Sequence, residues 1–190
     1  AAEAGMKMLA LGGSAVDAAI AIQAMLTLVE PQSSGIGGGA FMLHMDSATG
    51  EVTAFDGRET APKAVTEDLF LDAEGKPLGF FEAVVGGRAV GVPGVPALIF
   101  TLHETFGRLP LDRLFAPAIA LAEAGVPLSP RLAGLLADPR YSASLRADAA
   151  ATAHFYPGGA PATAGMLLPN PAFAETLRLM RDQGRAAVYG

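Results

Sequence analysis

An almost unbroken apolar stretch near the start of the chain restricts the possible folds more than any other segment. Residues 15–29 read AVDAAIAIQAMLTLV, which is alanine-rich and apolar on nearly every face of a helix. Such a helix must pack on several sides. Because Gln23 interrupts it, the run falls short of the roughly 20 apolar residues that a membrane-spanning helix needs. We expect a buried helix that begins after Ser14, with Asp17 completing a capping box, and ends before Pro31.

A β-hairpin is predicted after the glycine-rich loop that follows this helix. Residues 40–46 and 51–58 have strand character, and the turn sequence SATG at 47–50 separates them. Successive side chains of a strand point to opposite faces, so Asp56 and Arg58 should lie on the same face. The end of the second strand therefore presents a carboxylate and a guanidinium on one side.

The rest of the chain favours helices. The expected fold class is α+β, helix-rich, with the hairpin and one further short strand at residues 88–92. Predicted helices cover residues 3–11, 95–106, 111–124 and 130–137, and a last helix opens with Asn170 as N-cap and Pro171 at its first position. Pro117 should kink the third of these or make it restart, because proline lacks the N–H that an interior helical bond needs.

Length and composition predict one folded unit, part of whose apolar surface needs a binding partner to cover it. The 190 residues are 51% hydrophobic and 17% charged, which excludes disorder and is more apolar than usual for a free-standing domain. We expect residues 1–190 to form a single unit. Nineteen acidic against thirteen basic residues give a net charge of -6, and the basic residues are scattered, so no nucleic-acid partner is expected.

The sequence contains no complete catalytic or metal-binding constellation. There is no cysteine, which excludes disulfides and thiolate chemistry. Three histidines, at positions 44, 103 and 154, lack metal-ligand spacing, and His44 in an apolar strand is expected to be a core residue. The loop GIGGGA at 35–40 fits a dinucleotide-binding pattern, but it follows a helix and precedes a strand, the reverse of that motif's order. We expect no cofactor, no metal and no catalytic residue in this chain.

The segment DGRETAP at residues 56–62 is the strongest candidate site. Its arginine, Arg58, can grip a planar carboxylate with two parallel hydrogen bonds, which the point charge of lysine cannot reproduce. The alternative is a local ion pair between Arg58 and Asp56 or Glu59, which would contribute about 0–1 kcal/mol at an exposed position. The residue types leave both interpretations open.

Several motifs in a fixed order resemble the large-subunit region of the gamma-glutamyltransferase (gamma-glutamyltranspeptidase) family. They are GGSAVDAA at 12–19, PQSSGIGGG at 31–39, DGRETAP at 56–62, VGVPG at 90–94, the helix pattern at 114–125 and the Asn-Pro pair at 170–171. The resemblance extends over nearly the whole chain. It implies the N-terminal, large-subunit part of a precursor that cuts itself into large and small subunits and folds as an αββα sandwich.

The resemblance also implies an activity and residue roles. In this family an N-terminal threonine attacks the gamma-glutamyl amide of glutathione and passes the glutamyl group to water or an amino acceptor. Arg58 would hold the glutamyl α-carboxylate, with Asp56 and Glu59 orienting it. No threonine here has the family's cleavage context, so the chain alone should be inactive and should need the small subunit as partner. A glutaryl- or cephalosporin-type acylase and a non-catalytic binding domain of the same descent remain alternatives.

Two further expectations concern the surface and the compartment. A chain that holds only this half of the fold should expose apolar faces, especially on its hairpin, where Phe41, Leu43 and Met45 share one side. It should therefore self-associate or be only marginally stable. The first residues show no signal peptide. Bacterial relatives are often exported, so the resemblance implies a periplasmic or secreted enzyme without settling the compartment.

Overall fold

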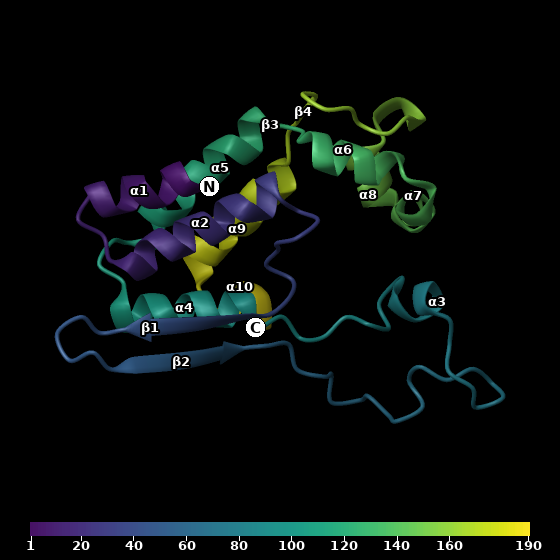
Figure 1. Cartoon of the computed structure of the whole chain (residues 1–190), viewed down its shortest axis with the longest axis horizontal. Helices are drawn as coiled ribbons and strands as arrows, with labels where there is room; N and C mark the ends of the chain where they lie inside the picture. The colour runs from purple at the N-terminus through teal and green to yellow at the C-terminus, as the bar shows by residue number, and fades with distance from the viewer.

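A helical layer forms the body of the molecule. The computed structural model describes residues 1–190. In it, α2 (Ala15–Val29) lies among α1 (Ala2–Ala10), α4 (Val95–Phe106), α5 (Leu111–Ala124) and α9 (Pro171–Gln183), as Figure 1 shows. These helices supply a core cluster of 21 buried residues. The prediction of a helix packed on several sides is confirmed, and none of the helices is both long and apolar enough to span a bilayer.

The start of α2 has the capping box that the sequence predicts. The hydroxyl of Ser14 accepts a hydrogen bond from the backbone N–H of Asp17 at 3.1 Å, and the carboxylate of Asp17 accepts one from the N–H of Ser14 at 2.7 Å. Two N–H groups that a helix start would leave without partners are thereby satisfied. The helix ends at Val29, just before Pro31, as expected.

The hairpin packs along α4 as a second layer. Strands β1 (Ala40–Met45) and β2 (Val52–Gly57) are antiparallel, and Ala40 lies opposite Gly57. On the inner face, the ring of His44 stacks on Phe106 with 3.9 Å between centroids, and Phe55 meets the same ring edge-on. His44 is half-buried there, in the apolar setting that its strand position predicts.

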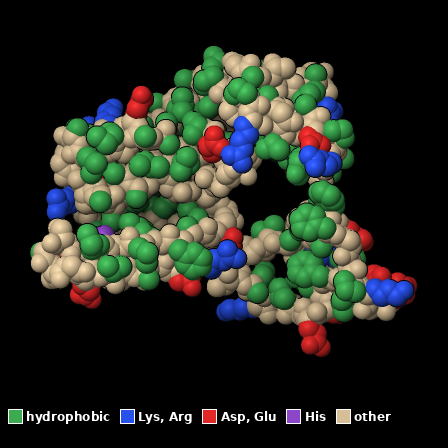
Figure 2. All heavy atoms as spheres, in the orientation of Figure 1, with side chains coloured by type: hydrophobic (Ala, Val, Ile, Leu, Met, Phe, Trp, Pro, Cys, Tyr) green, Lys and Arg blue, Asp and Glu red, His purple; other side chains and the backbone are tan.

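The outer face of the hairpin is apolar and uncovered. Phe41, Leu43, Met45 and Val52 are each more than half exposed. Figure 2 shows hydrophobic side chains at the surface in this part of the molecule. The expected exposure of the hairpin is confirmed, and we use "outer hairpin face" below for these four residues.

A smaller group of helices follows α5 and has its own small core. Its elements are β3 (Val126–Pro127), α6 (Pro130–Ala137), α7 (Pro139–Arg146), α8 (Ala149–Phe155), the 3-10 turn Pro157–Gly159 and β4 (Leu167–Leu168), which pairs with β3. Five buried residues form this core, and the hydroxyl of Tyr156 donates to the carbonyl of Leu136 at 3.1 Å. Helices α7 and α8 were not among the predicted elements. Their N-cap residues are Asp138 and Asp148, whose carboxylates accept hydrogen bonds from N–H groups in the first turn of each helix.

The prediction of a strand at residues 88–92 is wrong. Residues 88–92 form no strand; only Val92 pairs, with Thr60, in an isolated antiparallel bridge. The ladder does not extend because Pro62 has no N–H for the next hydrogen-bonded pair on one side, and on the other side the N–H of Gly94 donates to the carbonyl of Gly38 instead. The chain between these pairing residues leaves the body as an excursion that carries the short helix α3 (Phe80–Val84). Helix α5 runs through Pro117 without restarting, and it carries deeply buried side chains on both sides of the proline.

Candidate functional site

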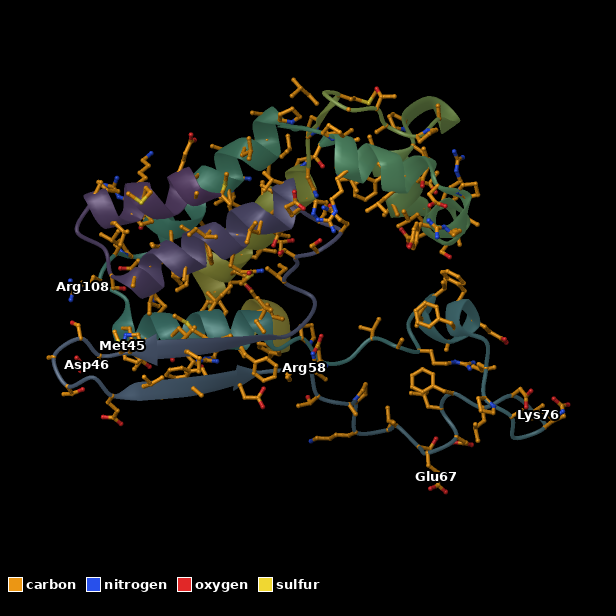
Figure 3. The ribbon with its side chains drawn as sticks, viewed as in Figure 1. Met45, Asp46, Arg58, Glu67, Lys76 and Arg108 are labelled. Carbon is orange, nitrogen blue, oxygen red and sulfur yellow. The ribbon has the colours of Figure 1, made fainter.

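Arg58 follows the last residue of β2 and stands at the end of the hairpin (Figure 3). Its side chain is 64% exposed, and its Nε lies 3.4 Å from Oε2 of Glu59. Asp56 does not pair with the guanidinium; its Oδ1 accepts a hydrogen bond from the backbone N–H of Arg58 at 2.9 Å. The structure records no hydrogen bond from the guanidinium, so its planar edge is available to a carboxylate.

The carboxylate of Glu59 lies against the glycine-rich loop. A Cβ atom at Gly39 would be 2.5 Å from Oε2 of Glu59 and 2.8 Å from Cα of Arg58, and one at Gly91 would be 2.8 Å from Cβ of Glu59. Any larger residue at Gly39 or Gly91 would push this segment away. Oε2 of Glu59 is buried without a hydrogen bond, because the contact with Nε of Arg58 has the distance of an ion pair but not hydrogen-bond geometry.

The segment at the start of α4 packs against the backbone of Arg58. A Cβ atom at Gly94 would be 2.0 Å from the carbonyl oxygen of Gly57 and 2.7 Å from that of Arg58. The N–H of Gly94 also donates to the carbonyl of Gly38 at 2.9 Å. The backbone of Arg58 is therefore held between two glycine-containing segments that are distant in sequence. The glycines of these segments allow the backbones to pack closely.

A hollow of about 300 Å³ opens beside Arg58. Its polar lining includes Thr60, Thr101 and Tyr189. Its apolar lining comes from β2, from the turn before α4 and from the first turn of α4, through Phe55, Val92, Pro93, Ala97 and Leu98. A second hollow, of about 470 Å³, lies along the glycine-rich loop and is lined by Glu59 together with Gln32. Each is large enough for the head of an amino acid, and the first offers a guanidinium next to hydroxyl groups.

Thr101 and Tyr189 line the hollow beside Arg58 but were not among the predicted site residues, which are Arg58, Asp56 and Glu59. Thr101 lies in the interior of α4 and Tyr189 ends the last helix, α10 (Ala186–Tyr189). No local spacing connects them with Arg58, because only the packing of α10 on α4 brings them to the same hollow. Asp56 and Arg58, which the strand pattern predicts on one face, are both exposed, and the guanidinium pairs with Glu59.

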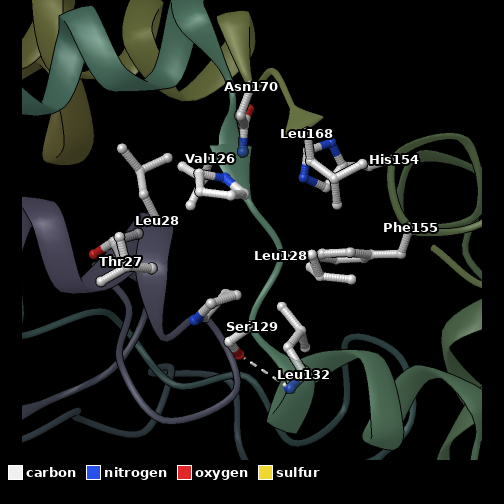
Figure 4. Close-up of a pocket in the computed structure, with 13 residues that line it drawn as sticks. Thr27, Leu28, Val126, Leu128, Ser129, Leu132, His154, Phe155, Leu168 and Asn170 are labelled. Carbon is white, nitrogen blue, oxygen red and sulfur yellow. Dashed lines mark hydrogen bonds between the residues drawn. The ribbon is translucent and has the colours of Figure 1, made fainter. Parts of the chain in front are cut away.

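The histidines are not part of this site. His44 stacks on Phe106, and Nε2 of His103 lies 2.7 Å from the carbonyl oxygen of Leu109. His154 lines a small hollow of about 50 Å³ between the two cores, beside Leu168 in Figure 4, and burial there lowers its pKa. The structure contains no group of three or more His, Cys, Asp or Glu side chains arranged to hold a metal ion.

Comparisons with known proteins agree on one family. The sequence model described as Gamma-glutamyltranspeptidase matches residues 1–190. The chain is 41% identical over 189 residues to the glutathione hydrolase proenzyme of Bacillus subtilis (strain 168), covering 100% of this chain and 32% of that protein. It is 37% identical over 195 residues to the acylase ACY 1 proenzyme of Pseudomonas sp. (strain V22), covering 100% of this chain and 34% of that protein.

The fold agrees with the sequence. The crystal structure of Helicobacter pylori gamma-glutamyltranspeptidase superposes with a TM-score of 0.91 and 34% identity, over 98% of this chain and 53% of that chain. The chain spans about a third of the length of the curated relatives it matches, and it corresponds to their N-terminal part. The helix-rich α+β fold and the predicted family are thereby confirmed. The chain belongs to the gamma-glutamyltranspeptidase family.

Proposed function

We propose that this chain is the carboxylate-binding part of an enzyme that cleaves gamma-glutamyl amides such as glutathione, and that Arg58 grips the glutamyl α-carboxylate. One observation carries the proposal: the guanidinium of Arg58 is exposed beside a hollow, with no hydrogen bond of its own, on a backbone fixed by tight glycine packing. A bidentate pair with a carboxylate fixes the orientation of a substrate as well as adding affinity.

The two neighbouring carboxylates orient the arginine. Glu59 contacts Nε of Arg58 at 3.4 Å, which leaves the outer edge of the guanidinium for the substrate. Asp56 accepts the backbone N–H of Arg58 at 2.9 Å and so fixes the turn from which the side chain emerges. Neither carboxylate needs to contact the substrate in these roles.

The chemical step requires residues beyond this chain. In the proposed enzyme the amine of an N-terminal threonine takes the proton of its own hydroxyl, whose oxygen attacks the gamma-glutamyl carbonyl. The amide C–N bond then breaks, the proton passes to the leaving amine, and water or an amino acceptor releases the glutamyl group from the acyl-enzyme. The small subunit that supplies this threonine would cover the outer hairpin face and complete an αββα sandwich with residues 1–190 as one unit. This chain alone would bind weakly, have no activity and self-associate.

An acylase of the same superfamily is the second candidate, and the likeness to the acylase ACY 1 proenzyme favours keeping it. A glutaryl amide also ends in a carboxylate, so Arg58 would serve both substrates. The two activities differ in whether the substrate carries an amino group next to that carboxylate. A non-catalytic binding domain is the third candidate and predicts no turnover with either class.

The test uses the enzyme made from the complete reading frame that encodes this chain. Release of 4-nitroaniline from gamma-glutamyl-4-nitroanilide and from glutaryl-4-nitroanilide separates the three candidates. Arg58→Ala should raise KM for the preferred donor at least ten- to a hundredfold, because even one hydrogen bond to a charged group is worth about 1.5–3 kcal/mol. Arg88→Ala, which removes an exposed arginine without an ion pair, is the matched control. An unchanged KM in Arg58→Ala would remove the assigned role.

A further inference from the structure

Helix α4 begins next to Arg58 without a cap from its own N-cap residue. That residue is Gly94, which has no side chain. Its place is fixed by space, since a Cβ atom there would be 2.0 Å from the carbonyl oxygen of Gly57. The usual capping residues, serine, threonine, aspartate and asparagine, cannot occupy this position. The free N–H groups of the first turn must therefore be satisfied from elsewhere.

Two acceptors distant in sequence, the carbonyl of Gly38 and the hydroxyl of Tyr189, bind the free N–H groups in the first turn of α4. The N–H of Val95 donates to the carbonyl of Gly38 at 3.0 Å. Pro96 has no N–H, and the N–H of Ala97 donates to the hydroxyl of Tyr189 at 3.0 Å. The same hydroxyl donates to the carbonyl of Pro93 at 2.5 Å. Tyr189 thus performs the work of an N-cap side chain and also holds the turn that leads into the helix.

A neighbouring residue on the last helical segment strengthens this attachment. Arg185 donates to the hydroxyl of Thr101 at 3.0 Å and to the carbonyl of Ala97 at 3.3 Å. It also pairs with Glu104 at 3.0 Å. Arg185 and Tyr189, at the two ends of this short segment, therefore attach it to α4.

The held turn is the one that packs on the carboxylate site. Gly94 lies against the carbonyl oxygens of Gly57 and Arg58, and Val92 pairs with Thr60 on the other side of Arg58. Tyr189 lines the same hollow as Arg58, and 39% of the residue is exposed. We propose that Tyr189 is a positioning residue: its hydroxyl fixes the Pro93–Gly94 turn and thereby the placement of the Arg58 guanidinium. This inference depends on the proposed function of Arg58.

The experiment is Tyr189→Phe in the enzyme from the complete reading frame, because phenylalanine keeps the ring and removes only the hydroxyl. KM for the gamma-glutamyl anilide should rise roughly five- to tenfold with kcat nearly unchanged, the pattern of lost uniform binding. Tyr141→Phe is the matched control, since Tyr141 is similarly exposed, lies on α7 and makes no hydrogen bond through its hydroxyl. If Tyr189→Phe does not fold, Arg185→Gln loosens the same segment and should show the same kinetic pattern.

A double-mutant cycle separates positioning from general support of the fold. In an Arg58→Ala background, Tyr189→Phe should cause no further rise in KM, because the group that it positions is gone. A full additional rise in the double variant, or an unchanged KM in Tyr189→Phe alone, would overturn the inference. An unchanged KM in Arg58→Ala alone would instead refute the proposed function, so the two failures are distinguishable.

Discussion

The carboxylate of Asp17 and the backbone N–H of Arg108, 91 positions apart in the chain, are joined by a hydrogen bond of 3.0 Å. Asp17 is fully buried and also accepts from the N–H of Leu109 at 3.3 Å and of Ser14 at 2.7 Å. One carboxylate therefore caps α2 and fixes the loop between α4 and α5. A buried charge is tolerated here because several N–H donors replace its water shell.

Asp17→Asn should destabilise the fold by about 2–3 kcal/mol. Asparagine lacks the charge that strengthens these hydrogen bonds, and its amide nitrogen would face the N–H of Arg108, which now lies 3.3 Å from Oδ1 of Asp17. Urea unfolding of the chain measures the change. Asp112→Asn is the control, because Asp112 is exposed at the start of α5 and its loss should change the free energy of unfolding by no more than about 0.5 kcal/mol. Equal changes in the free energy of unfolding for the two variants would show that the buried hydrogen bonds of Asp17 do not stabilise the fold more than an exposed aspartate does.

The outer hairpin face should make this chain self-associate when it is produced alone. Leu43 is 73% exposed at the centre of that face, and a lysine there would place a charge in any contact between two copies. Sedimentation equilibrium should show concentration-dependent association of the parent chain and a shift toward monomer in Leu43→Lys. Val90→Lys changes an exposed apolar residue elsewhere and should leave association unaltered. A compact monomer with a cooperative melt in the parent chain would contradict the prediction.

Local signals explain which parts of the fold the sequence predicts well. Helix α2 and the hairpin are specified by residues within a few positions of their ends, such as the capping pair Ser14 and Asp17. Helices α7 and α8 were missed because alanine, glycine and proline dominate their surroundings, although Asp138 and Asp148 are good N-caps. The prediction of a strand at residues 88–92 failed because a strand must pair with another segment, and local sequence does not show which segment is available.

The candidate site divides in the same way. Arg58 was identifiable because an arginine between two carboxylates near a strand end has a distinct chemistry. The contribution of Tyr189 was not identifiable, because it reaches the site only through the packing of α10 on α4. The role of the glycines is partly predictable. Their number indicates close packing, but only the fold shows which atoms an added Cβ would contact, such as the carbonyl oxygen of Gly57 for Gly94.

His154 should make stability depend on pH near neutrality. Burial lowers its pKa below the ordinary value of 6.5, so the unfolded chain binds the proton more readily than the folded one. The free energy of unfolding should therefore decrease as the pH drops through 6.5. His154 should cause no further decrease once the pH is below its pKa in the folded chain. Urea unfolding between about pH 7.5 and 5.5 should show a smaller loss in His154→Gln than in the parent chain. Identical slopes, or an NMR titration of His154 at or above its ordinary pKa, would refute the expectation.

Gly94→Ala should damage both the fold and the carboxylate site through a single methyl group. The backbone of Gly94 has φ -97°, which alanine adopts freely, so the objection is space rather than backbone conformation. The added Cβ would be 2.0 Å from the carbonyl oxygen of Gly57, and backbone on one side or the other must move. Overpacking of this kind destabilises by about 1–3 kcal/mol.

The matched control for Gly94→Ala is Gly79→Ala, which also alters the N-cap glycine of a helix. Gly79 precedes α3, has φ -61°, and a Cβ atom there meets nothing within 4 Å. Its replacement should leave stability and KM nearly unchanged. In the complete enzyme, Gly94→Ala should raise KM for the gamma-glutamyl donor, because the turn that moves is the one packed on Arg58. If Gly94→Ala matched Gly79→Ala in both stability and KM, the close packing of Gly94 on Gly57 could not be what holds the arginine in place.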